Sequence, residues 1–242
     1  MDNNDLIIAL AWPETMVRNA GAWYEGVTNF LKFSINGYYK AGHAAVVIID
    51  HKSGTVKYFD FGRYHTPLGK GRVRDEETDP DLRINTKAKF DQSGKILNVE
   101  EILIELKNNP STNGSGKLLA GVYQGISFSK AFSKAKELQD MEGIPYGPFV
   151  INGTNCSRFV AEVARGGLKL SYKKISLKMP YTLTPTPISN VRQLGGEGIF
   201  FKVSEDEVNR LENRKRSILN LILFKYPKGL IQSKIKTQLG NG

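Results

Sequence analysis

The predicted organisation of this chain centres on one stretch of sequence, Gly153-Thr154-Asn155-Cys156-Ser157-Arg158-Phe159-Val160-Ala161-Glu162-Val163-Ala164. Thr154 and Asn155 can each cap a helix, because their side-chain oxygens accept hydrogen bonds from the free N–H groups of its first turn. Apolar residues then recur at the three- and four-residue spacing of a buried helix face. We therefore expect a helix that begins beside the only cysteine of the chain and ends at Gly166 and Gly167.

Cys156 has two interpretations at this position. At a helix N-terminus, the unpaired N–H groups and the positive end of the helix dipole favour the thiolate, which is the nucleophilic form of cysteine. A lone cysteine is more commonly a small buried apolar residue. A histidine in a suitable setting elsewhere in the chain favours the nucleophile.

That histidine is His43, at the mouth of the most strand-like run in the sequence, Ala44–Ile49. The run does not alternate between apolar and polar residues, which predicts burial on both faces. Lys52-Ser53-Gly54 is a turn signal, and Thr55–Phe61 returns the chain as a partner strand. The small neighbours of His43 leave room for an imidazole that acts as a general base, and a capping or surface histidine is the alternative.

A catalytic histidine needs a third polar group that holds its tautomer and orientation. If the hairpin closes with Asp50 opposite Thr55, His43 faces Gly62 and Asp60 lies nearby on the same face of the sheet. Asp60 is our first choice for this role, because a carboxylate stabilises an imidazolium best.

Other residues are candidates for the remaining roles. A tighter turn moves the pairing of the histidine toward Arg63 or Tyr64, and Tyr64 and His65 are the alternative third residues. Tyr146, in the loop before the cysteine, is a candidate for binding an oxyanion, with packing as its alternative role. The backbone N–H of Cys156 is the stronger oxyanion donor, because a helix start directs it toward the carbonyl that a thiolate attacks.

Three segments together resemble a known family. They are Gly42-His43-Ala44-Ala45-Val46-Val47, Tyr58-Phe59-Asp60-Phe61-Gly62-Arg63-Tyr64 and Asn155-Cys156-Ser157-Arg158-Phe159-Val160. In order and context, these segments resemble the circularly permuted NlpC/P60 group of papain-like cysteine hydrolases. This group includes the relatives of lecithin retinol acyltransferase and the YiiX-like proteins. In permuted members the histidine strand precedes the cysteine helix, as it does here. The resemblance covers about residues 35–165.

This resemblance implies an α+β fold of permuted papain-like type, with a central antiparallel sheet and the cysteine helix packed against it. It implies Cys156 as nucleophile, His43 as base and a polar third residue, here Asp60. Family members commonly have a histidine in that third position, whereas His65 of this chain lies later in the sequence. The relatives include peptidoglycan peptidases, amidases and lipid acyltransferases, and they need no metal or organic cofactor. A small bacterial family found particularly in Bacteroidetes is more similar still and implies no substrate.

Composition indicates one globular domain over residues 1–242, with 40% apolar and 24% charged residues. We expect a core at about residues 35–165, followed by a C-terminal strand and a basic helical extension at 166–242. The net charge is +10, and residues 207–242 hold eight basic and two acidic side chains. A solvated helix face explains this charge, and an anionic partner is the alternative. The rival function is therefore a catalytically inactive binding module, although no nucleic-acid-binding motif is present.

The sequence also bears on compartment and cofactor. One cysteine excludes an intramolecular disulfide and multi-cysteine zinc motifs. No apolar run approaches the roughly 20 residues that span a bilayer, so we expect no transmembrane segment. The acidic start Met1–Asp5 does not resemble a secretory signal, which favours the cytoplasm unless the sequence has been trimmed.

Periodicity predicts the remaining elements. Strands are expected at Leu6–Leu10, Leu118–Ile126 and Ile199–Val203, and helices at Glu14–Phe33, Asn98–Leu106 and Ser127–Glu142. The charged segment Pro67–Asp81 is expected to be a loop, either a rim over the site or a solvated connection. After Gly167 we expect a strand and a proline-rich loop, and Ser204–Glu207 predicts a capping box that opens a final basic helix.

Overall fold

The structure is a computed structural model that describes residues 4–18, 34–35, 38–39, 42–178, 184–195, 200–205 and 207–211. These residues belong to one compact unit, Met1–Leu211. Residues 212–242 lie outside the described part of the chain. The predicted single domain over 1–242 and its basic C-terminal helix therefore stay predictions.

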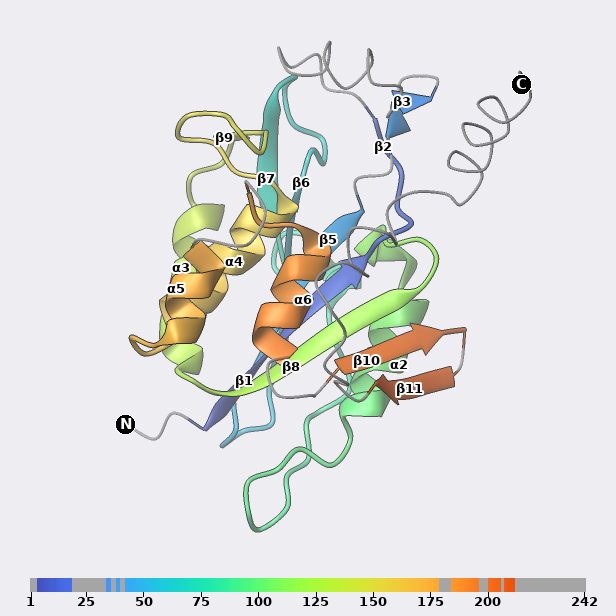
Figure 1. Cartoon of the computed structure of the whole chain (residues 1–242), viewed down its shortest axis with the longest axis vertical. Coiled ribbons are helices and arrows are strands. Elements are labelled where there is room, and N and C mark those ends of the chain that lie inside the picture. The colour runs from blue at the N-terminus through green and yellow to red at the C-terminus, as the bar shows by residue number, and fades with distance from the viewer. Residues whose placement is uncertain are drawn as a thin grey trace, which may run out of the picture. The chain divides into compact units, whose positions relative to one another are not determined.

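The described residues form a mixed α+β fold around a large antiparallel sheet (Figure 1). Its strand order is β11-β10-β8-β1-β5-β6-β7-β9. The strands are β1 (Asp5–Trp12), β5 (His43–Ile49), β6 (Val56–Gly62), β7 (Lys70–Arg74), β8 (Leu118–Ile126), β9 (Ile144–Pro145), β10 (Phe200–Ser204) and β11 (Glu207–Leu211). A small second sheet contains β2 (Val17–Arg18), β3 (Ser34–Ile35) and β4 (Tyr38–Tyr39).

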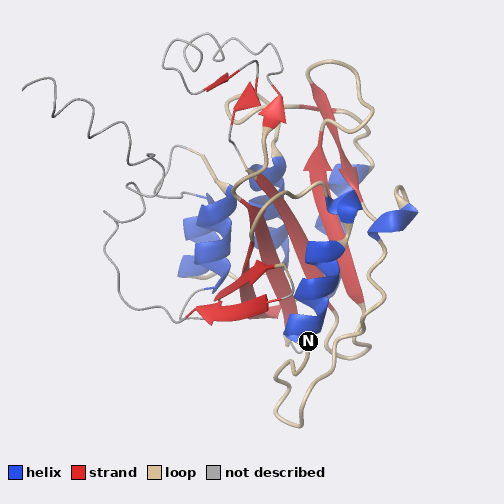
Figure 2. Cartoon of the chain, turned by 90° about the vertical axis from the view of Figure 1, so that its right-hand side faces the viewer, coloured by secondary structure: helices blue, strands red, loops and turns tan. Residues whose placement is uncertain are grey.

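Helices flank the large sheet on both sides (Figure 2). They are α2 (Val99–Asn108), α3 (Phe128–Gln139), α4 (Cys156–Gly167), α5 (Tyr172–Lys178) and α6 (Pro187–Gly195), with short 3-10 turns η1 (Pro80–Leu82) and η2 (Pro110–Thr112). On one face, alternate residues of β1 and β5 pack against α3, α4, α5 and α6. On the other face, the intervening residues pack against α2. Burial on both faces explains why these strands are continuously apolar.

The β5–β6 hairpin has the register in which Asp50 lies opposite Thr55, and not the alternative with a tighter turn. The N–H of Asp50 donates to the carbonyl of Thr55 at 3.0 Å, and Ala45 lies opposite Asp60. Every residue of β5 is buried, as the apolar run predicts. A shift of one residue would move Asp60 to the opposite face of the sheet, so this register determines which side chains can meet His43.

Helix capping follows the sequence closely in two helices. Asn155 caps α4 by accepting a hydrogen bond from the N–H of Arg158, and Ser127 caps α3 by accepting one from the N–H of Lys130. Both residues satisfy backbone donors that have no partner inside the helix. The expected helix beside Cys156, its packing on the sheet and the helix after Ser127 are therefore confirmed.

We expected the charged segment Pro67–Asp81 to be a loop, and this is wrong in part. The segment contains strand β7, which pairs with β6. The charged residues obscure an alternation with a period of two: Val73 packs into the core on the face of the sheet that carries α3, whereas Arg72 and Arg74 point to the other face. Arg74 is itself buried. The salt bridges of these arginines replace the apolar contacts by which strands are usually recognised.

The C-terminal prediction is also wrong in part. The segment after Gly167 forms α5 and α6 where a strand and loop were expected. Pro187 begins α6, a position that tolerates proline because the first N–H of a helix has no helical partner. Strand β10 is confirmed, but β11 follows Ser204–Glu205 in a hairpin, so this segment opens no helix. Similarly, the described end of the expected helix Glu14–Phe33 contains strand β2, and residues 19–33 lie outside the described chain.

The contact between α6 and β8 leaves no room for a side chain at Gly121. A Cβ atom there would lie 2.0 Å from the carbonyl oxygen of Val191. Gly121→Ala is therefore expected to lower the free energy of unfolding by about 1–3 kcal/mol, the usual cost of overpacking. Urea denaturation followed by circular dichroism measures this loss. Gly143→Ala is the control, because its nearest neighbour is the flexible Lys70 side chain at 3.3 Å. Equal losses in the two variants would contradict the close packing of α6.

Candidate active site

Cys156 is the first residue of α4, and the preceding loop is held in place from within the helix. The guanidinium of Arg158 donates to the carbonyl oxygens of Gly147, Pro148 and Val150 at 3.3–3.4 Å. On the other side, the amide of Asn190 in α6 donates to the carbonyl oxygen of Ser157 at 2.7 Å. The N-terminus of α4 is thus bound both to the preceding loop and to α6. Cys156 at this position is 8% exposed.

His43 is held at the start of β5 by the neighbouring strand. Trp12 lies opposite it in the β1–β5 register, and the two rings stack with centroids 5.7 Å apart. Gly42, which precedes it, has a φ of +73° and approaches the carbonyl oxygen of Trp12, so that an added Cβ would lie at 3.1 Å. Only glycine adopts this backbone conformation without strain. The His43 side chain is 10% exposed, so the imidazole has little contact with solvent.

The thiol of Cys156 and the imidazole of His43 interact directly. Both residues line the same cleft, and each shifts the pKa of the other through hydrogen bonding and charge, with a further contribution to the thiolate from the backbone N–H of Ala44. Burial by itself would lower the pKa of His43, but the hydrogen bonds to Asp60 and Cys156 outweigh it and raise this pKa to about 9. Burial would raise the pKa of Cys156, but the hydrogen bond and positive charge of His43 lower it below its ordinary value. The geometry therefore favours a thiolate–imidazolium pair.

Asp60 lies on the far side of His43 and is completely buried. Its Oδ2 is 3.4 Å from Nε2 of His43 and accepts hydrogen bonds from the hydroxyls of Tyr58 at 2.9 Å and Tyr64 at 3.2 Å. Arg74 donates from Nε to Oδ1 at 3.0 Å and from Nη2 to Oδ2 at 2.7 Å. Burial would raise the pKa of Asp60, but the hydrogen bonds from His43 and Arg74 lower it below its ordinary value. The carboxylate is therefore charged.

Tyr64 folds back over the end of β6 and reaches the same group. Its hydroxyl is 3.4 Å from Nε2 of His43, and its ring lies 3.4 Å from the guanidinium carbon of Arg74. This fold depends on Gly62, where an added Cβ would lie 2.4 Å from the tyrosine ring. Burial raises the pKa of Tyr64 well above its usual value, so the hydroxyl keeps its proton and can donate to Asp60.

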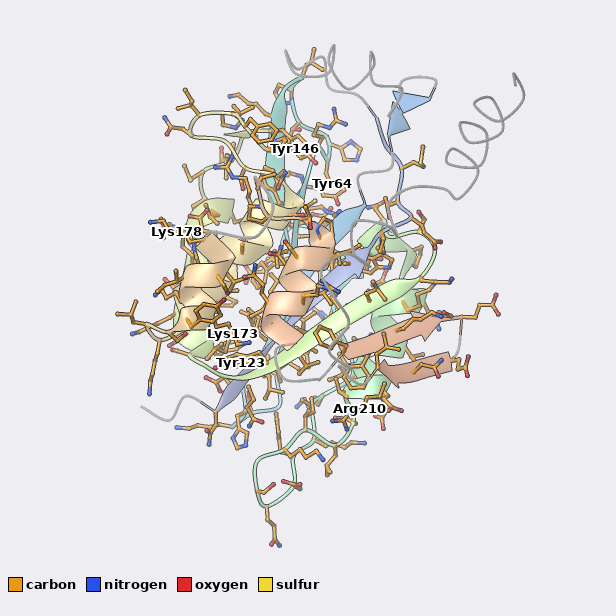
Figure 3. All side chains as sticks on the ribbon, in the orientation of Figure 1. Tyr64, Tyr123, Tyr146, Lys173, Lys178 and Arg210 are labelled. Atoms are coloured by element: carbon orange, nitrogen blue, oxygen red, sulfur yellow. The ribbon has the colours of Figure 1, made fainter. Side chains whose placement is uncertain are left out.

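A cleft of about 330 Å³ opens beside these residues, and its lining includes His43, Arg63, Tyr64, Asn113, Tyr146 and Cys156. Tyr146 stacks on Phe61 with ring centroids 5.7 Å apart, and the guanidinium carbon of Arg63 lies over the Tyr146 ring, 5.2 Å from its centroid. Figure 3 shows Tyr64 and Tyr146 close together at one end of the sheet. Tyr146 is therefore both a packing residue and part of the cleft wall.

The structure brings most of the expected site residues together. Cys156, His43, Asp60 and Tyr64 form one connected group, whereas His65 is exposed and lies outside the cleft. Their catalytic roles stay a prediction. Sequence reasoning missed two partners of Asp60. Arg74 lies in a segment that its charge predicts to be a loop, although the alternation of Arg72, Val73 and Arg74 indicates a strand. The sequence pattern predicts Tyr58 only as part of a strand.

Comparison with known proteins shows the family to which the chain belongs. A family model described as type VI secretion system effector TseH-like matches residues 7–170, which include the His43 strand and Cys156. The chain belongs to this TseH-like family. The crystal structure of the type VI secretion system effector TseH matches with a TM-score of 0.58 and 20% identity, over 87% of this chain and 99% of that chain. This likeness shows that the chain shares the fold of the TseH structure. None of the curated proteins compared with the chain matches it.

Two further findings concern cofactors and membranes. Within the described residues, no cluster of three or more His, Cys, Asp or Glu side chains is arranged to hold a metal ion. In the same part of the chain, no helix combines the length and apolar character needed to cross a bilayer.

The contact between Cys156 and His43 predicts an acid-shifted thiol. Alkylation of Cys156 by iodoacetamide, followed by mass spectrometry, is expected to show a pH midpoint below the ordinary thiol value of about 8.5. In His43→Ala the midpoint should rise to that value or above it, because burial then acts without a compensating charge. The chain contains one cysteine, so the label reports one group. Identical midpoints in the two proteins would contradict the pairing.

The buried ion pair of Asp60 and Arg74 predicts a large effect on stability. Asp60→Asn is expected to lower the free energy of unfolding at pH 7 by about 3–5 kcal/mol, because it leaves Arg74 buried without its counter-charge. The pKa of Asp60 is lower in the folded chain than in the unfolded one. Its stabilising contribution is thus present above about pH 4 and is lost as the pH falls through the folded value.

Urea denaturation at pH 7 and at pH 3 tests this, since the gap between wild type and Asp60→Asn should narrow in acid. Asp79→Asn is the matched control. Asp79 also accepts a bidentate pair, from Arg72 at 2.8 and 2.9 Å, but both side chains are about a quarter exposed. We expect this control to lose about 1 kcal/mol or less. If Asp79→Asn lowered the free energy of unfolding as much as Asp60→Asn does, burial of the Asp60–Arg74 pair would not explain the larger effect.

Proposed function

We propose that the chain is a cysteine-dependent hydrolase or acyltransferase that acts on an amide, ester or thioester bond. The observation that carries the proposal is the contact of Cys156, at a helix N-terminus, with a histidine that is itself held by a buried carboxylate. This is the arrangement of nucleophile, base and orienting group that thiol acyl transfer requires. The cleft gives the thiol access to a substrate carbonyl.

In the proposed mechanism, His43 takes the proton of Cys156, and the sulfur attacks the carbonyl carbon of the substrate. The backbone N–H of Cys156, at the positive end of α4, stabilises the oxyanion. The bond to the leaving nitrogen, oxygen or sulfur then breaks, and His43 returns its proton to the leaving group. Water or another acceptor attacks the thioester and regenerates the thiol. Because Nε2 of His43 faces Asp60, Nδ1 is the nitrogen that exchanges a proton with the thiol.

The order of elements supports a permuted papain-like interpretation of the fold. The histidine strand β5 precedes the cysteine helix α4, and α4 packs on the antiparallel sheet. Membership of the TseH-like family supports a role as an effector of a type VI secretion system. In this proposal the protein is secreted to reach its substrate, in contrast to the cytoplasmic location expected from the sequence.

Acyl-enzyme formation tests this proposal without knowledge of the natural substrate. With an activated nitrophenyl ester, the wild type is expected to release nitrophenol in a burst and to gain the acyl mass on Cys156 in mass spectrometry. Cys156→Ala should form no adduct. His43→Ala should react about 10²–10⁴-fold more slowly, the usual contribution of a general base.

His65→Asn is the matched control for loss of a histidine. His65 is exposed, lies outside the cleft and has a φ of +49°, which asparagine tolerates. We expect this variant to react at the wild-type rate. Adduct formation at another residue, or a burst that survives Cys156→Ala, would refute the proposed function.

A further inference from the structure

Arg74 is a buried cation next to the proposed catalytic group. Its side chain is 6% exposed, and its guanidinium faces both oxygens of Asp60. We propose that Arg74 is a positioning residue: it fixes the Asp60 carboxylate, and through that carboxylate the His43 imidazole that pairs with Cys156. The inference rests on the proposed function, because Arg74 has this role only if His43 and Cys156 exchange a proton.

The two-pronged contact is what gives Arg74 control of orientation. Oδ2 of Asp60 faces His43 and also accepts hydrogen bonds from Tyr58 and Tyr64, whereas Oδ1 accepts one from Nε of Arg74. A carboxylate bound through one oxygen can still rotate about its Cβ–Cγ bond. A guanidinium that donates to both oxygens fixes the plane of the group, and lysine cannot reproduce this geometry. Arg74 therefore keeps Oδ2 directed at Nε2 of His43.

Arg74 supports two further groups at the cleft. Its guanidinium carbon lies 3.4 Å from the ring centroid of Tyr64, whose hydroxyl contacts both His43 and Asp60. Its Nη2 also donates to the carbonyl oxygen of Ser111 at 3.0 Å. Ser111 belongs to η2, which leads directly into Asn113 of the cleft wall. One side chain thus ties the carboxylate, the tyrosine and the cleft wall together.

The charges around this group set the direction of the expected effect. Arg74 faces Asp60, Tyr58 and Tyr64, with Asp79 at 3.9 Å, and His43 faces Asp60, Tyr64 and Cys156. The positive charge of Arg74 helps to keep the pKa of Asp60 low despite burial. Without it, the carboxylate would be both less firmly oriented and less readily ionised. Its hold on the His43 imidazolium would weaken, and the thiolate would lose its partner.

The test is the pH profile of Cys156 alkylation by iodoacetamide, which needs no natural substrate. Arg74→Gln is expected to raise the midpoint by about one pH unit, so that labelling on the acid side becomes about tenfold slower. Arg74→Lys should raise it less, because the positive charge remains while the fork is lost. In His43→Ala, adding Arg74→Gln should shift the midpoint no further, since the effect passes through the imidazole.

Arg72→Lys is the matched control. Arg72 lies on the same strand and binds a different carboxylate, that of Asp79, through Nη1 and Nη2 at 2.8 and 2.9 Å. Its Nε donates to the backbone carbonyl oxygen of Tyr64 and contacts no side chain of the proposed group, so the midpoint of this variant should equal that of the wild type. Melting temperatures identify the folded variants, and Arg74→Lys supplies the readout if Arg74→Gln does not fold. A lower melting temperature with an unchanged midpoint would overturn the inference, because Arg74 would then be structural only. A shift that persists in the His43→Ala background would also overturn it. If His43→Ala alone does not move the midpoint, the proposed function fails instead.

Discussion

Asp60 is a charged group with no exposure to solvent, and this constraint shapes the whole end of the sheet around it. Removing a carboxylate from water costs several kcal/mol, which is recovered only if hydrogen-bond donors surround it in good geometry. Here the donors come from three adjacent strands and the loop after β6. The strands must therefore keep a single register, because a slip by one residue would leave the carboxylate among apolar side chains.

The group at this end of the sheet has charges of alternating sign. When the thiol is ionised and the imidazole protonated, a thiolate at Cys156, an imidazolium at His43, a carboxylate at Asp60 and a guanidinium at Arg74 follow one another. Each charge is stabilised by its neighbours, so the row can be buried with little net charge. One end meets the positive pole of α4, and of the four groups Cys156 and His43 line the cleft, whereas Asp60 and Arg74 do not. A molecule in the cleft can thus reach the sulfur and the imidazole but not the ion pair behind them.

The two faces of the sheet contribute different residues to this group. The face that carries α4 provides the cysteine, and the face that carries α2 holds the apolar residues that neighbour His43 and Asp60 along their strands. The two sets meet where β5 begins, around Gly42 and Trp12. Small residues are needed there because helix, strand and loop approach closely. An added Cβ at Gly114, for example, would lie 2.2 Å from the Trp12 ring.

Local patterns in the sequence were sufficient for several parts of this structure. The cap at Asn155, the apolar run of β5 and the turn before β6 depend on neighbouring residues, whereas the sequence left two registers of the hairpin open and the structure has the one with Asp50 opposite Thr55. From these features the sequence predicts that Cys156, His43 and Asp60 belong to one site. Other features depend on partners that are distant in sequence: Arg74 is buried because Asp60 is opposite, and α6 is a helix packed under β8. The sequence by itself determined which side chains can do chemistry, because capping and strand patterns are local. Only the tertiary structure decided how they are held, because burial and charge pairing are set by residues that fold together from across the chain.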